Sequence, residues 1–192
     1  ENITDEGVRH LAALPHLRSL DVARSRVTDA GLAHLRDVKT LESLWLPSEG
    51  ISDTGLEYLS QLPRLRSLSV SRAYRGDSSG EQGYYTDKGI RMLAHCRDLE
   101  ELSVGSIAMT DASMEAIATL GNLRNLALFG CTAVTDEGLK AHRDAYCDAV
   151  RALHAQGKMA RTWPLRYLIR HTAFHTLDHA WEIEDRAIWN AG

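Results

Sequence analysis

Residues 28–35 read Thr-Asp-Ala-Gly-Leu-Ala-His-Leu, and the Thr-Asp-x-Gly step that opens this stretch recurs through the chain. The spacings between six successive steps are 24, 24, 34, 24 and 25 residues, with starts at Thr4, Thr28, Ser52, Thr86, Thr110 and Thr135. A fixed period in this range is typical of solenoid proteins, in which each repeat is one supersecondary unit. The period therefore predicts a solenoid before any single residue is interpreted.

Each repeat contains two hydrophobic periods. Apolar residues first recur every three positions, as in Leu32, Leu35 and Val38, which predicts a short amphipathic helix. The second half alternates, as in Leu44-Trp45-Leu46, which predicts a strand. Thr or Ser can cap a helix start, and Asp suits the positive end of the helix dipole. We therefore expect an α/β solenoid with a concave parallel sheet and helices on the convex side.

This pattern resembles the leucine-rich repeat superfamily. It is most similar to the cysteine-containing subtype and to bacterial arrays that carry the sequence of residues 28–35, and the resemblance covers residues 3–140. The cysteine of that subtype is present only at Cys131, while the matching places hold Ser25, Glu49 and Ile107. The resemblance implies that residues 1–140 form a leucine-rich repeat array of about six units that binds a protein partner.

In a sheet of this kind, the residues that flank the repeated leucines point outward. The columns are Ser19/Asp21/Ala23, Ser43/Trp45/Pro47, Ser67/Ser69/Ser71, Glu101/Ser103/Gly105 and Asn125/Ala127/Phe129. Most of these residues are small and neutral, whereas Trp45 and Phe129 are large and apolar. An exposed tryptophan is a candidate binding hot spot. We expect a binding surface that includes Trp45, Ser69, Glu101 and Phe129; the alternative is that Trp45 packs on a neighbouring column.

The 34-residue spacing indicates an insertion at residues 71–85, after the third strand. Its glycine, serine and charged residues predict an exposed loop, and insertions between repeats often carry binding residues. Tyr74, Arg75, Asp77 and Tyr84 are therefore further candidate binding residues, and Tyr85 is expected to contact a partner beside them. The alternative is a solvated loop with no partner.

The composition changes after residue 140. Three of the four tryptophans and five of the nine histidines follow this point. Two helices are expected, one from about Asp136 to His154 and one from Pro164, a favourable first-turn residue, to about Ile188. Residues 141–192 are thus predicted to be a C-terminal helical segment.

The second of these expected helices carries histidines at positions 171, 175 and 179, and residues four apart share a helix face. Residues 138–190 resemble the last helices of DinB-like four-helix metalloproteins, a family that includes thiol-dependent transferases. The resemblance implies that His175 and His179 are paired ligands of a divalent metal such as Zn or Ni. Glu182, three residues later, is a candidate third ligand. The first two helices of such a bundle are not visible in this chain.

Three interpretations of residues 141–192 therefore remain. The helices only cap the array, or they keep a metal site, or they are part of a working enzyme. Capping alone is favoured, because a solenoid must cover its last apolar layer. We accordingly expect no cofactor.

Composition narrows the remaining function classes. The net charge of -4 argues against nucleic acid or an anionic membrane as a partner, and no apolar run reaches the ~20 residues of a membrane span. Three scattered cysteines are expected to be small buried hydrophobes in a reducing compartment, which favours the cytoplasm. The start at Glu1 suggests a fragment or a processed form. No phosphate loop or nucleophile elbow is present, so a binding module is expected rather than an enzyme.

Overall fold

The computed structural model of the chain describes residues 3–47, 49–71, 85–106, 108–140 and 166–170. Helices and strands alternate, and all neighbouring strands pair in parallel in the order β1-β2-β3-β4-β5-β6. The helices are α1 (Asp5–Ala12), α2 (Asp29–Leu35), α3 (Asp53–Leu59), α4 (Asp87–Leu93) and α5 (Asp111–Ile117). The strands are β1 (Ser19–Asp21), β2 (Ser43–Pro47), β3 (Ser67–Ser71), β4 (Glu101–Val104), β5 (Asn125–Phe129) and β6 (Arg166–Arg170). The expected α/β solenoid is confirmed.

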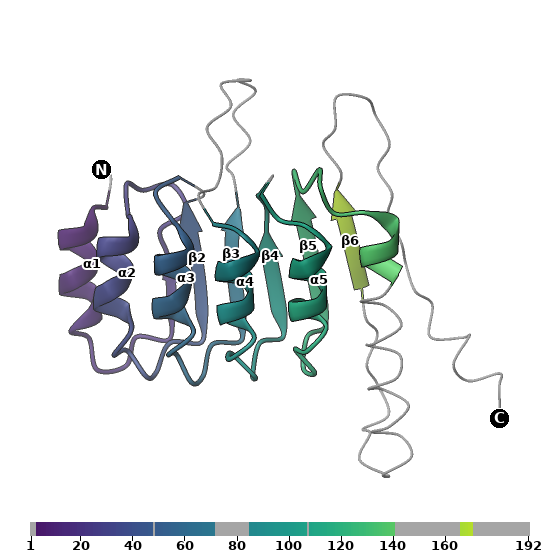
Figure 1. Ribbon diagram of the computed structural model, residues 1–192. Helices are drawn as coiled ribbons and strands as arrows, with labels where there is room; N and C mark the ends of the chain where they lie inside the picture. Colours follow the sequence, from purple (N-terminus) through teal and green to yellow (C-terminus); the bar gives the residue numbers. More distant parts are fainter. Residues whose placement is uncertain (1–2, 48, 72–84, 107, 141–165, 171–192) are drawn as a thin grey trace, which may run out of the picture.

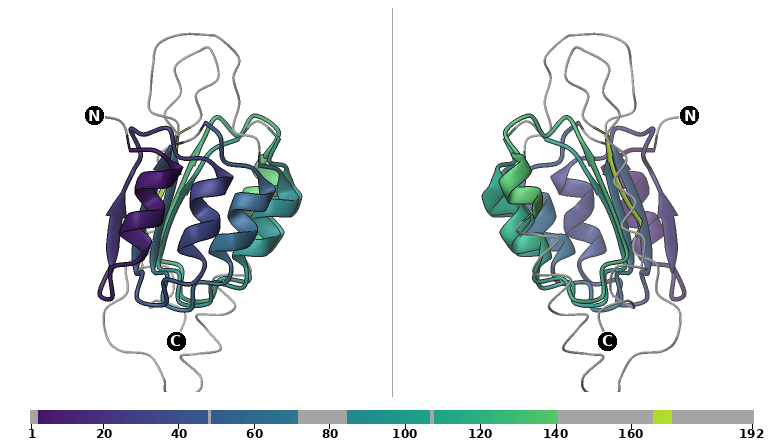
Figure 2. Two further views of the ribbon diagram at one scale, coloured as in Figure 1. Left: turned by 90° about the vertical axis from the view of Figure 1, so that its left-hand side faces the viewer. Right: turned by 90° about the vertical axis from the view of Figure 1, so that its right-hand side faces the viewer.

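The elements form two layers. Helices α1 to α5 lie side by side and cover one face of the sheet (Figure 1). Views from the two ends of the array show the helix layer on one side of the strands (Figure 2). The described helices therefore leave the opposite face of the sheet uncovered.

The core lies between these layers and is made of leucine columns that run from repeat to repeat. The register aligns Leu20, Leu44, Leu68, Leu102 and Leu126, all of them buried. Successive residues of a strand point to opposite faces, so every second strand residue enters the core. Because each column is shared among repeats, no repeat completes its core alone.

The aspartate of each Thr-Asp-x-Gly step joins its repeat to the next one. The Asp29 carboxylate accepts a hydrogen bond from the Ser52 backbone N–H at 2.9 Å and another from the Ser52 hydroxyl. The equivalent pairs of bonds run from Thr28 to Asp5, from Thr86 to Asp53, from Thr110 to Asp87 and from Thr135 to Asp111. Each carboxylate thus holds the start of the following helix in register.

The glycine of the step makes room for this link. A Cβ atom built on Gly55 would lie 2.3 Å from Oδ1 of Asp29. The aspartate of the preceding repeat approaches Gly31, Gly89 and Gly138 in the same way. The first residue of the step also caps its own helix, as predicted, because Thr28, Ser52, Thr86 and Thr110 each accept a bond from the N–H two residues later.

Ser113 replaces glycine in the fifth step and adds a donor to the link. Its hydroxyl donates a hydrogen bond to Oδ1 of Asp87. Burial of Asp87 favours the neutral acid, but hydrogen bonds from Ser113 and Thr110 outweigh it and hold the pKa of Asp87 below its usual value. This junction therefore depends on an ionised carboxylate.

The prediction for Tyr85 is wrong, because this residue belongs to the core. Its side chain is 0% exposed. The phenol oxygen accepts a hydrogen bond from the Gly105 N–H at 2.7 Å and lies 2.8 Å and 3.2 Å from the carbonyl oxygens of Gly105 and Val70. A tyrosine is long enough to reach the ends of β3 and β4 and to satisfy its hydroxyl there. Tyr85 therefore fastens the chain to the sheet where it returns from the insertion.

The C-terminal prediction is confirmed at its start and wrong further on. Residues 136–140 are helical, as expected. Residues 166–170, expected in a second helix, instead form β6, which pairs in parallel with β5. A Tyr-Leu-Ile run favours a strand, and pairing satisfies the backbone groups at the edge of β5. The other residues of the two expected helices lie outside the described part of the chain.

Candidate functional site

The uncovered face of the sheet carries two rows of side chains. One row consists of Ser19, Ser43, Ser67, Glu101 and Asn125. The other row consists of Asp21, Trp45, Ser69, Ser103 and Ala127. All ten side chains are exposed or half-buried. We call these two rows the open sheet face.

Trp45 is the large apolar side chain of the open sheet face. It is 36% exposed, which confirms that it points outward from the sheet. In the described part of the chain, the other exposed large hydrophobic residue is Leu14, at 49%, in the turn after α1. The register places Asp21 on one side of Trp45 and Ser69 on the other. Trp45 is thus a large apolar side chain between two small polar ones.

Glu101 is held in place by its neighbours in the same row. Its carboxylate accepts a hydrogen bond from the Ser67 hydroxyl at 3.0 Å and one from the Asn125 side-chain amide at 3.2 Å. A carboxylate has about four acceptor positions. Glu101 can therefore receive a further donor without losing these bonds.

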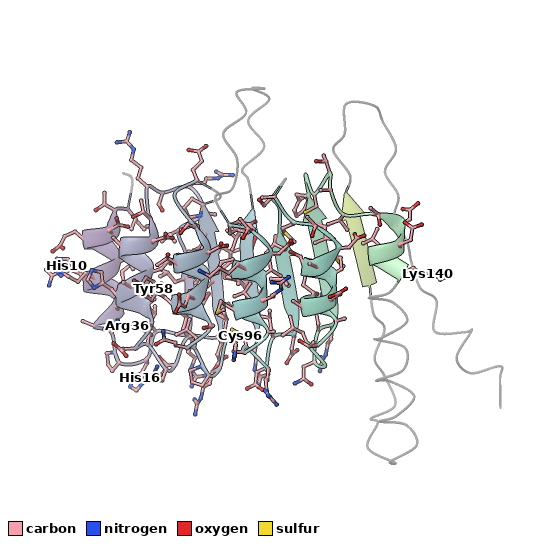
Figure 3. All side chains as sticks on the ribbon, viewed as in Figure 1. His10, His16, Arg36, Tyr58, Cys96 and Lys140 are labelled. Carbon is pink, nitrogen blue, oxygen red and sulfur yellow. The ribbon has the colours of Figure 1, made fainter. Side chains whose placement is uncertain are left out.

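The open sheet face is anionic over strands β1 to β4. Its charged residues there are Asp21 and Glu101, and the described residues of β1 to β5 include no lysine or arginine. Asp21 was not among the binding residues expected from the sequence, although its alternation with Leu20 placed it in an outward column. The helix layer differs, because its surface carries long cationic side chains such as Arg36 (Figure 3).

The third outward row expected from the sequence is wrong at Pro47 and Gly105, which are buried. Ala23 and Phe129 of the same row are half-buried, as Ser69 and Ser103 are. A Cβ atom on Gly105 would lie 2.2 Å from the Phe129 carbonyl oxygen, so the backbones pack closely here. The buried Tyr85 also bonds to the backbone of Gly105 through its phenol oxygen. The third row is therefore closed at Pro47 and Gly105, while Ala23 and Phe129 stay partly accessible beside the open sheet face.

Several expected site residues cannot be placed. Tyr74, Arg75, Asp77 and Tyr84 of the insertion lie outside the described residues, so their roles stay predictions. The same holds for His175, His179 and Glu182, and with them for the Zn or Ni site. Within the described ranges, no three His, Cys, Asp or Glu side chains form a group that could hold a metal ion. No described helix is long and apolar enough to cross a membrane.

Cys96 and Cys131 are buried, as expected of small hydrophobic residues. Burial raises the pKa of the Cys96 thiol to about 12 and also raises the pKa of the Cys131 thiol. A reactive cysteine needs an accessible thiolate. Neither thiol is therefore suited to act as a nucleophile. Cys147 lies outside the described residues.

Comparison with known proteins agrees with the repeat. A family model described as a leucine-rich repeat matches residues 13–35 and 122–141. The chain is also 33% identical, over 78 residues, to the DNA repair protein rhp7 of Schizosaccharomyces pombe. That match covers 38% of this chain and 14% of the length of the relative. The chain therefore contains leucine-rich repeats.

Proposed function

We propose that this leucine-rich repeat array is a protein-interaction module that binds its partner on the open sheet face, around Trp45. The observation that carries the proposal is the 36% exposure of Trp45 on a sheet whose leucines are buried. Tryptophan is among the residues most enriched in binding hot spots. Leucine-rich repeats commonly bind proteins, which supports the same assignment.

The surroundings of Trp45 suit a protein partner. The serines and Ala127 of the two rows are small, so a partner can approach the sheet closely. The strands are fixed by parallel pairing and by the leucine columns, so little order has to be gained on binding. The proposal does not include DNA repair, because the shared region is 14% of that relative.

A displayed library of protein fragments tests this function. Fragments that bind the wild-type chain are selected, and their affinity for Trp45→Ala and Leu14→Ala is then measured. Trp45→Ala should weaken binding about 30-fold, as expected for a hot spot, whereas Leu14→Ala should leave it unchanged. Leu14 is the matched control, because it is exposed but lies away from the sheet. Fragments that bind Trp45→Ala as tightly as the wild type would show that the partner uses another surface.

A further inference from the structure

The open sheet face carries negative charge without a cation of its own. We infer that it recognises an extended, cationic segment of the partner, with one Arg or Lys side chain on Trp45 beside Asp21 and a second one at Glu101. This inference rests on the proposed function and adds the chemistry of the partner. It concerns strands β1 to β4, because β6 carries Arg166 and Arg170 at the register positions of Asn125 and Phe129.

Charge is the first argument. Asp21 and Glu101 are both exposed, and the ion pairs between described residues do not involve either of them. Two of those ion pairs lie on α1 and one lies in the turn after α2. The other two join Glu100 to Arg66 and Arg124, the residues that come directly before β4, β3 and β5. Among the described residues, the two carboxylates of the open sheet face thus have no cationic partner and can accept one from a bound segment. The same charges repel phosphate groups, so the face does not suit nucleic acid.

The pairing of Asp21 with Trp45 is the second argument. These residues are register partners on β1 and β2 and point to the same side of the sheet. Neighbouring strands are about 4.8 Å apart. A guanidinium or ammonium group can therefore lie against the indole ring while it pairs with the Asp21 carboxylate. The backbone N–H of Ala23 donates to Oδ1 of Asp21 at 3.0 Å and fixes the carboxylate in this place.

The third argument is the distance between the two acids. Three strand spacings and two residues along a strand separate them, which amounts to roughly 16 Å. Four residues of an extended peptide span about 13 Å, and residues four apart point to the same side. The long side chains of Arg and Lys cover the remaining distance. We therefore expect basic residues at positions i and i+4 of a segment that runs across the strands.

Selection from a displayed library of random dodecapeptides tests the inference. Peptides selected on the wild-type chain should be enriched in Arg or Lys with a spacing of four, and their binding should be lost on Trp45→Ala. If Trp45-dependent peptides show no excess of basic residues, the inference is wrong while the proposed function stands. If no selected peptide depends on Trp45, both are wrong.

Neutral variants of nearly equal shape then test each acid with the selected peptides. Asp21→Asn keeps the acceptor for Ala23, and Glu101→Gln keeps an acceptor for its neighbours. Each should weaken binding about two- to fivefold at low ionic strength, and the difference from wild type should shrink in ~1 M salt. Glu57→Gln, at an exposed position of α3 in the helix layer, should leave binding unchanged. Equal affinity of the wild type and both sheet variants would overturn the inference.

Discussion

Gly55 shows why the Thr-Asp-x-Gly step contains a glycine. Replacement of a helical glycine by alanine normally stabilises a helix by up to ~1 kcal/mol. At Gly55 the new methyl group would collide with Oδ1 of Asp29, 2.3 Å away, and displace a carboxylate that bonds to Ser52. We expect the collision to prevail, so that Gly55→Ala lowers the free energy of unfolding by about 1–3 kcal/mol. Urea denaturation followed by circular dichroism measures the change.

Gly7 provides the matched control, because no aspartate among the described residues lies against it. The nearest atom to a Cβ built there is Cγ2 of Ile3, at 3.2 Å. Gly7→Ala should be neutral or slightly stabilising, since a small movement of Ile3 accommodates the methyl group and the helix propensity improves. Similar losses in both variants would mean that the aspartate link is not the reason for the glycine.

The lowered pKa of Asp87 predicts a pH dependence of stability. A carboxyl group whose pKa is lower in the folded state stabilises the fold above its unfolded pKa of about 3.9. This contribution is lost as the pH falls below that value and through the folded pKa. Ser113→Ala removes one donor to Asp87, so its effect on the urea midpoint should be larger at pH 7 than near pH ~3. An effect that does not change with pH would show that Ser113 does not act through the ionised carboxylate.

At the scale of elements, Tyr85 joins the end of the insertion to strands β3 and β4. Tyr85→Phe keeps the ring but leaves the Gly105 N–H without the phenol oxygen that accepts its bond. We expect a loss of about 1–3 kcal/mol in the free energy of unfolding, as is usual for a buried donor that loses its partner. Tyr58→Phe, at a half-buried position of α3, should cost less. Thermal or urea unfolding of both variants decides the matter, and equal effects would contradict the proposed anchor.

The elements also show what sequence patterns can and cannot predict. Helix starts and the outward position of Trp45 follow from local periodicity, and both predictions are confirmed. Strand β6 was not predicted from the sequence, because Pro164 and the spaced histidines favour a helix. The unpaired edge of β5, which favours a strand, exists only in the folded sheet. The burial of Gly105 and Tyr85 was not predicted for a similar reason, because the two residues contact each other although they are 20 positions apart in the sequence.

At the scale of the whole molecule, the described part of the chain is a row of repeats in which each repeat bonds to the next one. Stability in such an array is close to a sum of repeat and interface contributions. The Asp53 link is central and spans the insertion, where its carboxylate accepts bonds from the N–H and hydroxyl of Thr86 and from the N–H of Gly89. The Asp5 link joins only the first repeat to the second. The position of a broken link should therefore determine which part of the array unfolds.

Asp53→Ala and Asp5→Ala test this expectation, because both remove one carboxylate from the first turn of a helix. Each should cost the interface about 2 kcal/mol, as for hydrogen bonds to a charged group. In Asp5→Ala the loss of amide-exchange protection should stay within α1 and β1, since the remaining interfaces are intact. In Asp53→Ala the two halves of the array should separate into two unfolding transitions in urea, because the weakened interface lies between them. A single sharp transition in Asp53→Ala, with uniform protection on both sides, would mean that the leucine columns alone carry the coupling between repeats.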